Sequence, residues 1–447
     1  MPDSSPTPPT SPDTGTHVVP SVYMTGDLPG IGGRIKSRDT DFLVEEIPLY
    51  TPVGDGEHLY LFVEKQGMST LDMLGILAKH FRVHRRAVGY AGLKDKHAVT
   101  RQMVSIHAPG QRPEDFPEIR HEQIRVLWAD LHTNKLRPGH LLGNRFSIKT
   151  RAVRMTDALA AKRVIDRLRE TGVPNRIGEQ RFGLLAQNHI IGRELILGRE
   201  REALDILLGP DPAHPTNHAE ARARYAAADY RAAAGLLPFA MRTERDLLDR
   251  LARGESPGGA WASADKRAVG FFMSAFQSAV FNAVLDERVA DGTIGTLLAG
   301  DIAMKHDNRA LFEVTTDTSD DPHEAARCAR FEVSPTGPMW GATMMRAFDR
   351  VGEAEDRILR AFGVTPEDID RAHDTRRVPL QGSRRPLRVP IIDPEVEGGT
   401  DEHGPYVRCA FDLPRGSFAT VVMREVMKPE QHKNAAPLTD DEPDADA

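Results

Sequence analysis

The spacing of apolar and polar side chains predicts a strand-rich beginning, a helical middle and a strand-rich end. Alternating apolar and polar residues, or short apolar runs between turn residues, are typical of strands, whereas apolar residues three and four apart are typical of helices. In the first part, strands are predicted over residues 42–47, 58–65, 101–108, 125–132 and 144–153. Helices are predicted from Thr70, which serves as an N-cap, and from Thr156, with Gly172 and Pro174 ending the second one.

The rest of the chain changes character twice. Helical structure is predicted over residues 200–253 and 267–290. Many Pro, Gly and Arg residues predict irregular structure over residues 331–340 and 376–394. Strands are predicted again over residues 406–411 and 417–427, on either side of a turn at 413–416. This order suggests that one domain is inserted into another, so that the two ends of the chain pair in one sheet.

Length and composition are those of a multidomain globular protein, with 447 residues and a mass of 49.4 kDa. Residues 1–20 and 429–447 are predicted to be disordered tails, because they hold too few apolar residues to form a core. No apolar run approaches the roughly 18 residues that span a bilayer, and the first 16 residues do not form a secretion signal. Two cysteines, Cys328 and Cys409, exclude a disulfide framework and favour a reducing compartment. We therefore expect a cytoplasmic protein without a membrane partner.

The charge of the chain is unevenly distributed. The formal net charge is −7, yet residues 85–154 contain fourteen basic and six acidic residues. Such a basic stretch in an acidic chain is compatible with a surface that binds phosphate groups of a nucleic acid. A solvated basic face without a partner explains the same pattern equally well.

One segment carries candidate chemistry, residues 90–102 with the sequence YAGLKDKHAVTRQ. Asp95 stands between Lys94 and Lys96, and two ammonium groups close to a carboxylate stabilise its ionised form. An ionised, positioned carboxylate is what a nucleophile or a general base needs. A simple surface turn is the alternative for this tripeptide.

A second candidate lies in the predicted strand at 144–153. Asn144 and Phe146 would share one face of that strand, because side chains alternate between faces. An amide next to an aromatic ring suits a nucleic-acid base, since the amide reads a base edge and the ring stacks on the base. Alternatively, Phe146 points into the core and Asn144 is a turn residue.

Motifs of other chemistries are absent from the sequence. There is no phosphate-binding loop, no dinucleotide-binding glycine motif, no His-Glu-x-x-His zinc motif and no nucleophile elbow. His80 and His84 are four residues apart on a predicted helix, but no carboxylate with suitable spacing accompanies them. We therefore expect neither a metal ion nor a nucleotide cofactor.

Several segments together resemble the TruD family of tRNA pseudouridine synthases, which modify uridine 13 of tRNA. They occur in the family's order and extend over most of the chain. The matching segments are AGLKDKHAVTRQ (91–102), GNRF (143–146), VPNRIGEQRFG (173–183), SAFQSAVFN (274–282), GD (300–301), LPRGSFAT (413–420) and RE (424–425). Arg176-Ile177 and Arg145 depart from the family pattern without touching the expected chemistry.

The resemblance implies an α+β fold. Its catalytic domain has a mixed, mainly antiparallel sheet and is interrupted by an inserted, TruD-specific α/β domain. On this sequence we place the catalytic domain at residues 21–178 and 389–428 and the inserted domain at residues 179–388. The expected partner is tRNA, the expected enzyme is an isomerase without a cofactor, and we expect it to be a monomer.

The resemblance also implies roles for single residues. Asp95 matches the nucleophilic aspartate, Phe42 matches an aromatic residue lining the site, and Phe418 matches a C-terminal aromatic residue that binds substrate. Asn144 matches a substrate-binding asparagine, and Phe146 matches the aromatic residue that stacks on the target base. We add Lys94 and Lys96 to the predicted substrate-binding residues because they flank Asp95.

The implied reaction begins with a uridine that leaves the base stack. The Asp95 carboxylate then opens the glycosidic bond, either by attack on C1′ or as a base at the sugar, and the uracil rotates and rejoins through C5. Two other functions stay open. A catalytically silent RNA-binding protein would have the same scaffold, and an unrelated hydrolase with a nucleophilic aspartate would contain segment 91–102 by coincidence.

Overall fold

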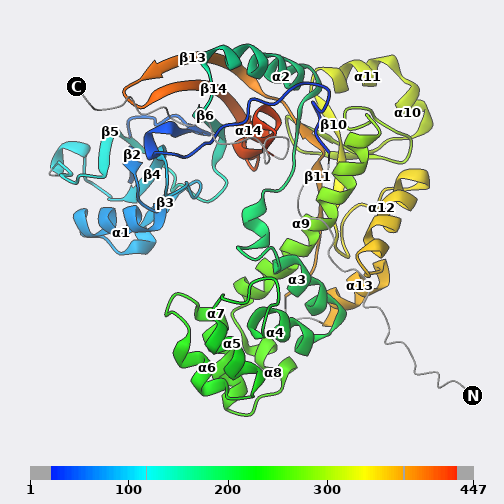
Figure 1. Cartoon of the computed structure of the whole chain (residues 1–447). Helices are drawn as coiled ribbons and strands as arrows, with labels where there is room; N and C mark the ends of the chain where they lie inside the picture. Colours follow the sequence, from blue (N-terminus) through cyan, green and yellow to red (C-terminus); the bar gives the residue numbers. More distant parts are fainter. Residues whose placement is uncertain (1–21, 117, 376–377, 430–447) are drawn as a thin grey trace, which may run out of the picture. The chain divides into compact units, whose positions relative to one another are not determined.

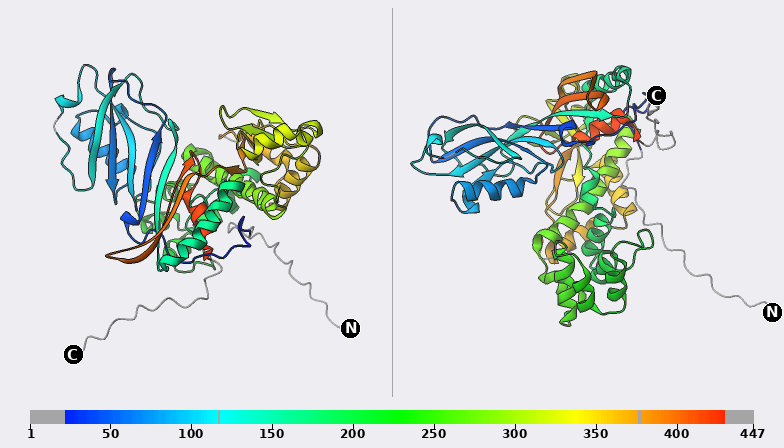
Figure 2. Two further views of the ribbon diagram at one scale, coloured as in Figure 1. Left: turned by 90° about the horizontal axis from the view of Figure 1, so that it is seen from above. Right: turned by 60° about the vertical axis from the view of Figure 1, so that its left-hand side comes forward.

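The computed structural model describes residues 22–116, 118–375 and 378–429, so the two predicted tails lie outside the described residues except for residue 429. The chain forms two compact units (Figures 1 and 2). The first unit consists of Met24–Asn175 and the residues from Arg388 on, and the second contains Arg176–Leu387. The assignment of these units to a catalytic and an inserted domain stays a prediction.

The first unit is built on an eight-stranded sheet with the order β13-β14-β6-β1-β4-β2-β5, in which β3 pairs with β4. Its strands are β1 Phe42–Pro48, β2 His58–Gln66, β3 Val88–Tyr90, β4 Val99–His107, β5 Ile124–His132, β6 Leu141–Arg151, β13 Ile392–Asp401 and β14 Gly404–Pro414. The pair β1–β4 is parallel, and the other pairs of this sheet are antiparallel. The predicted mixed, mainly antiparallel sheet is confirmed.

Strands from the two ends of the chain lie side by side in this sheet. Figure 1 shows β14, in orange, beside β6, in teal, and β6 pairs in turn with β1. The close approach depends on Gly143, because a Cβ atom there would lie 2.2 Å from the carbonyl oxygen of Leu413. The expectation that both ends share one sheet is therefore confirmed.

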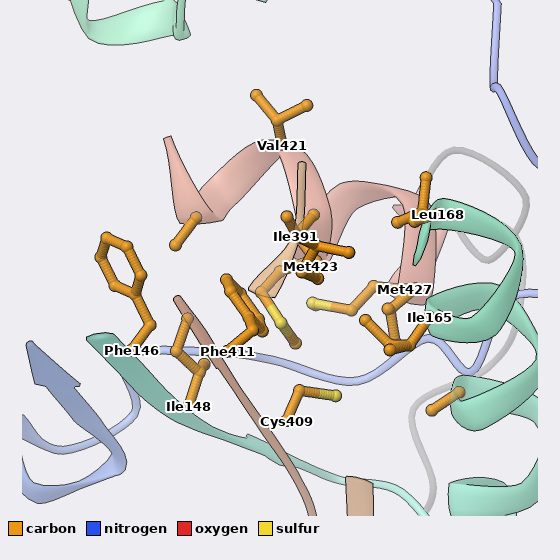
Figure 3. Packing of buried hydrophobic residues seen from close by; sticks show 14 of the residues in the cluster. Phe146, Ile148, Ile165, Leu168, Ile391, Cys409, Phe411, Val421, Met423 and Met427 are labelled. Atoms are coloured by element: carbon orange, nitrogen blue, oxygen red, sulfur yellow. The ribbon is translucent and has the colours of Figure 1, made fainter. Parts of the chain in front are cut away.

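Three helices cover the sheet of the first unit: α1 Thr70–His80, α2 Ala158–Thr171 and α14 Ala419–Met427. Helices α2 and α14 bury one core together with β6 and β14, and Figure 3 shows Ile165 and Leu168 of α2 facing Met423 and Met427 of α14. Helix α1 packs on β2 and β4 in a separate core. Short strands β7 Val173–Pro174 and β12 Arg388–Val389 pair where the chain leaves and re-enters this unit.

Two predictions about helix positions were wrong. Most of the strand predicted at 417–427 is helix α14, Ala419–Met427, because the burial of its apolar face against α2 outweighs the strand preference of its β-branched residues. The N-cap of α1 is Ser69, whose hydroxyl accepts a hydrogen bond from the backbone N–H of Asp72. The hydroxyl of Thr70 instead accepts a hydrogen bond from the backbone of Lys94.

Within its described residues, the second unit combines eleven helices with a four-stranded sheet of order β11-β10-β8-β9. Its strands are β8 Ile302–Lys305, β9 Leu311–Glu313, β10 Val333–Met339 and β11 Ser383–Pro386. Its helices are α3 Asn188–Leu197, α4 Glu200–Leu208, α5 Ala219–Ala226, α6 Tyr230–Leu236, α7 Arg242–Ala252, α8 Pro257–Ser263, α9 Lys266–Ala290, α10 Thr316–Asp320, α11 Pro322–Ala329, α12 Asp349–Ala361 and α13 Pro366–Thr375. Short 3-10 turns in the two units lie at Asp39–Asp41, Arg85–Ala87, Pro113–Asp115, Met155–Asp157 and Glu179–Phe182.

Strands β10 and β11 and the start of β13 lie where irregular structure was predicted. Strand β10 contains Pro335 and Pro338, which normally interrupt a sheet. It tolerates them because its first half, Val333 to Pro335, pairs with β8 and its second half pairs with β11. Each half of β10 therefore pairs with a neighbouring strand on one side, and a proline, which lacks the N–H donor, can be accommodated on the unpaired side.

Helix α9 is long and apolar enough to cross a membrane by length and composition. Polar residues interrupt its apolar stretches, so it contains no continuous apolar run of that length. Its most apolar window is 67% buried, as is usual for the core helix of a globular unit. The helix packs closely against α3, since a Cβ atom at Gly192 would lie 2.1 Å from the carbonyl oxygen of Phe272. Its burial favours a core helix over a membrane span.

Candidate active site

Asp95 lies on the loop that joins β3 to β4, and this loop is held at several points. The buried ammonium of Lys65 donates to the carbonyl oxygens of Met68 and Asp95, both at 2.8 Å. The backbone N–H of Lys94 donates to the hydroxyl of Thr70 at 2.9 Å. Gln102 donates to the carbonyl of Gly92 at 3.1 Å. These hydrogen bonds hold the backbone of the loop around Asp95 in place.

The carboxylate of Asp95 is accessible and has a cation beside it. Lys36 Nζ lies 2.9 Å from Asp95 Oδ2, and the side chains of Lys36 and Asp95 are 26% and 40% exposed. The same ammonium lies 4.5 Å from the centre of the Phe42 ring. Lys36 therefore connects Asp95 with Phe42, two residues that the sequence singled out separately.

Sequence reasoning did not find Lys36, because it is 59 positions away from Asp95 and no motif marks it. The prediction that Lys94 and Lys96 both act on the carboxylate of Asp95 is wrong for Lys94. The Lys94 ammonium pairs instead with Glu46, and Lys96 is exposed on the surface of the loop.

Lys94 and Glu46 form a buried ion pair next to Asn144. Lys94 Nζ lies 2.8 Å from Glu46 Oε2 and 2.8 Å from Asn144 Oδ1. The side chains of Lys94 and Glu46 are 5% and 0% exposed. Burial raises the pKa of Glu46, while the charge and hydrogen bond of Lys94 act in the opposite direction. The second carboxylate oxygen accepts a hydrogen bond from the backbone N–H of Met103 at 3.2 Å.

The pairing of β1 with β6 brings the other predicted residues onto one face of the sheet. Glu46 lies opposite Asn144 and Val44 lies opposite Phe146. Phe146 is 7% exposed, and its ring centre lies 5.8 Å from that of Phe411 (Figure 3). The structure thus gives Phe146 a core position at the edge of the cluster, whereas Asn144 is half-buried.

The two remaining aromatic candidates differ in exposure. Phe42 begins β1 and is 2% exposed, so its ring is part of the core. Phe418 follows the turn after β14 as the N-cap residue of α14 and is 39% exposed. Among the three predicted aromatic residues, Phe418 presents the most surface to an incoming base.

Much of the basic stretch at 85–154 is neutralised by acidic residues from outside that stretch. Arg101, for example, lies 2.9 Å from Glu45 and 2.8 Å from Glu64. Similar ion pairs join Lys94 to Glu46, Arg145 to Asp412, Lys149 to Asp401, and Arg151 to Asp41 and Asp401. Hydrogen bonds from Arg151 and Lys149 hold the pKa of Asp401 far below its usual range. The charge counted along the sequence therefore overstates the basic surface.

The other segments that carry the resemblance make hydrogen bonds inside their own units. In the second unit, the side chain of Asn282 accepts from the N–H of Ile177 at 2.9 Å and donates to its carbonyl at 3.0 Å. Asp301 is buried and accepts two hydrogen bonds from Arg288. In the first unit, Glu425 accepts hydrogen bonds from the backbone N–H groups of Met24 and Thr25 at 2.9 and 3.0 Å.

One group among the described residues could bring three ligand atoms to a common ion, formed by Asp321, His323 and Glu324. It lies at the surface of the second unit, at the start of α11, and exposed acidic groups of this kind are common without a metal. We therefore assign no cofactor to it.

Comparisons with known proteins agree on one family. The family model of tRNA pseudouridine synthase D (TruD) matches residues 19–426. The chain is 43% identical over 410 residues to the tRNA pseudouridine synthase D of Geobacter metallireducens, covering 91% of this chain and 97% of the relative. It is 36% identical over 422 residues to that of Thermus thermophilus, covering 94% and 96%. A crystal structure of the TruD protein from Methanosarcina mazei matches with a TM-score of 0.77 and 26% identity, over 92% of this chain and 97% of that one.

Proposed function

The chain belongs to the tRNA pseudouridine synthase D (TruD) family, and on this premise we propose that it isomerises uridine 13 of tRNA to pseudouridine with Asp95 as the nucleophile. The predicted family, the predicted fold class and the activity of a tRNA pseudouridine synthase, an isomerase, are confirmed. The position in the tRNA and the roles of single residues are parts of the proposal.

The observation that carries the proposal is the environment of the Asp95 carboxylate. It is 40% exposed, has an ammonium counterion at 2.9 Å and sits on a loop whose backbone is fixed by Lys65 and Thr70. Electrostatic stabilisation is most effective when the groups are held in place before the reaction begins. A carboxylate that is accessible, has a counterion beside it and sits on a fixed loop meets the requirements for attack at a sugar carbon.

The reaction conserves all atoms of the uridine except one exchanged proton. The target base leaves the stack at a cost of about a few kcal/mol. The Asp95 carboxylate opens the bond between N1 and C1′, by attack on C1′ or as a base at the sugar. The detached uracil rotates and C5 forms the new bond to C1′, which on the first route breaks the bond between Asp95 and C1′ and on the second is accompanied by return of the proton from Asp95 to the sugar. C5 then loses its proton, and N1 gains one. No electron transfer is involved.

The remaining site residues have supporting roles in this proposal. Asn144 binds an edge of the base, the exposed Phe418 provides aromatic surface, and the exposed Lys96 meets a phosphate of the RNA. Phe146 and Phe42, whose rings are mostly buried, line the site from the core side. We further propose that the protein acts as a monomer in the cytoplasm, and that the unit made of Met24–Asn175 and the residues from Arg388 on is its catalytic domain.

Replacing Asp95 by Asn tests the nucleophile, because it keeps the size of the side chain and removes its charge. We expect undetectable turnover of tRNA, with RNA affinity within a few-fold of wild type. Asp166→Asn is the matched control, since Asp166 also forms an exposed pair with a lysine, at 2.8 Å from Lys162 on α2. Conversion by Asp95→Asn at more than about a hundredth of the normal rate excludes Asp95 as nucleophile, because loss of a covalent catalyst costs several powers of ten.

The position of the modified uridine is tested separately by mapping pseudouridine in cellular RNA with and without this protein. We expect one signal to disappear, at position 13 of tRNA. Loss of a signal elsewhere would contradict the position and leave the role of Asp95 intact. Binding of tRNA without any conversion would favour the catalytically silent RNA-binding protein.

A further inference from the structure

We infer that Lys94 is a positioning residue that orients the amide of Asn144, so that Asn144 offers a hydrogen-bond donor to a carbonyl oxygen of the flipped uracil. This inference rests on the proposed function, because it requires Asn144 to contact the target base. It assigns Lys94 a role different from the direct substrate contact that the sequence suggested.

The chemistry of the contact fixes the direction of the amide. Lys94 Nζ lies 2.8 Å from the side chain of Asn144. An ammonium group has donors only, whereas an amide has one accepting oxygen and one donating NH2 group. The oxygen of Asn144 must therefore face Lys94, and its NH2 group points away from the ion pair. The reverse orientation would bring two donors together.

Lys94 cannot easily give up this position, because Glu46 holds it from the other side. The Glu46 side chain is 0% exposed, and its Oε2 atom lies 2.8 Å from Lys94 Nζ as an ion pair. If the ammonium moved away, a buried carboxylate would lose its counterion, which is strongly unfavourable. The backbone of Lys94 is also fixed, through its hydrogen bond to Thr70. The orientation of Asn144 is thus set before any RNA binds.

A fixed donor suits uracil in both orientations that the reaction requires. The Watson–Crick edge of uracil presents O2, N3–H and O4, which is acceptor, donor, acceptor. Rotation of the ring about the line through N3 and C6 exchanges N1 with C5 and O2 with O4. The NH2 group of Asn144 therefore meets a carbonyl oxygen before and after the rotation. Cytosine has an amino donor in place of O4, so in one of the two orientations donor would face donor.

Thio-substituted substrates test this hydrogen bond, since sulfur is a weaker acceptor than oxygen. Single-turnover rates are measured on tRNA carrying uridine, 2-thiouridine or 4-thiouridine at the target position. For the wild type we expect at least one thio substitution to slow the reaction about 3- to 10-fold, the size expected for one neutral hydrogen bond. The ratio of rates, uridine to thiouridine, is then compared between variants, which removes the intrinsic effect of sulfur on the chemistry.

In Lys94→Met and in Asn144→Asp, the ratio of the uridine rate to the thiouridine rate should fall below the wild-type ratio, because the hydrogen bond that sulfur weakens is missing. Asn144→Asp keeps an oxygen for Lys94 and replaces the donating NH2 group by a second acceptor, although it also adds a negative charge on the ammonium that Glu46 shares. Lys96→Met is the matched control, because it removes a neighbouring charge from the same loop; its rate falls if Lys96 meets a phosphate, but the ratio of the two rates should stay at the wild-type value. If Lys94→Met does not fold, the variant with Lys94→Met and Glu46→Gln together removes the buried charge, and the same ratio is read.

The outcomes separate this inference from the proposed function. A variant Lys94→Met that loses rate but keeps the wild-type ratio overturns the inference, because Lys94 then acts only on stability or RNA affinity. The inference is also overturned if Asn144→Asp keeps the wild-type ratio of the uridine rate to the thiouridine rate. In both cases an active wild type leaves the proposed function standing. A wild type that converts no uridine contradicts both.

Discussion

The role of Phe146 is open to a sharp test, because the structure supplies a matched partner. The sequence suggests that Phe146 stacks on the target base, whereas the structure buries its ring against Phe411, with the ring centres 5.8 Å apart. Phe146→Leu keeps an apolar side chain and removes the flat ring. Phe411→Leu removes the other ring of the same pair, which is 1% exposed and cannot reach a substrate.

The two roles predict different magnitudes. As a core pair, the rings contribute about 0.5–1.5 kcal/mol beyond their burial, and a swap of similar volume costs less than about 1.5 kcal/mol. Each variant should therefore lose about 1–3 kcal/mol in free energy of unfolding, and the melting temperature should fall by about 2–4 °C per kcal/mol. Stacking on a base is worth roughly 1–3 kcal/mol. Its loss should slow turnover about 5- to 150-fold.

Thermal unfolding and single-turnover rates at saturating enzyme are measured on the same preparations. If Phe146 stacks on the uracil, both variants are destabilised similarly but only Phe146→Leu loses turnover. A destabilised and fully active Phe146→Leu refutes stacking by Phe146 and leaves Phe418, the exposed one of the two other predicted aromatic residues, as the candidate. An equal loss of turnover in both variants would show that the packing of this pair, rather than the ring face, matters.

Two further predictions concern electrostatics. If the unpaired part of the basic stretch at 85–154 contacts RNA, log affinity should fall with log salt by about 0.7–0.9 per phosphate contact, and a nearly flat plot would contradict it. Burial lowers the pKa of Lys65 to about 8 from an ordinary 10.5, so from pH 8 to 10.5 the unfolded state binds more protons than the folded state. Over that range the wild type should gain stability relative to Lys65→Met, by up to about 3 kcal/mol; a difference in unfolding free energy that does not change with pH would refute this.

The sequence predicts six of the eight described strands of the first unit, because each is an apolar or alternating run between turn residues, and it misses β3 and β13. Strand β2, predicted at 58–65, is observed at His58–Gln66, and β5 differs from its predicted start by one residue. The pattern fails where tertiary contacts decide. The apolar run of α14 is equally compatible with a strand, and only its packing against α2 selects the helix.

The site shows the same limit more clearly. Asp95 and Asn144 could be singled out because each lies in a local motif, but the groups that fix them come from distant positions. Lys36 supplies the counterion of Asp95, and Glu46 holds Lys94. Neither residue stands out by spacing or composition. An ion pair between distant segments leaves no periodic trace in a sequence, so this part of the site required the structure.

The first unit consists of two stretches of chain, and this affects how it folds during synthesis on the ribosome. Strand β6 is synthesised early, whereas its partner β14 and the covering helix α14 follow only after Arg176–Leu387. At about 5–20 residues per second, this interval lasts on the order of ten seconds to a minute. During that time β6 has an open edge and the apolar face around Phe146 and Ile148 is uncovered. The nascent chain is therefore exposed to misassociation for as long as its second unit is being made, and a chaperone that shields a strand edge would act in that interval.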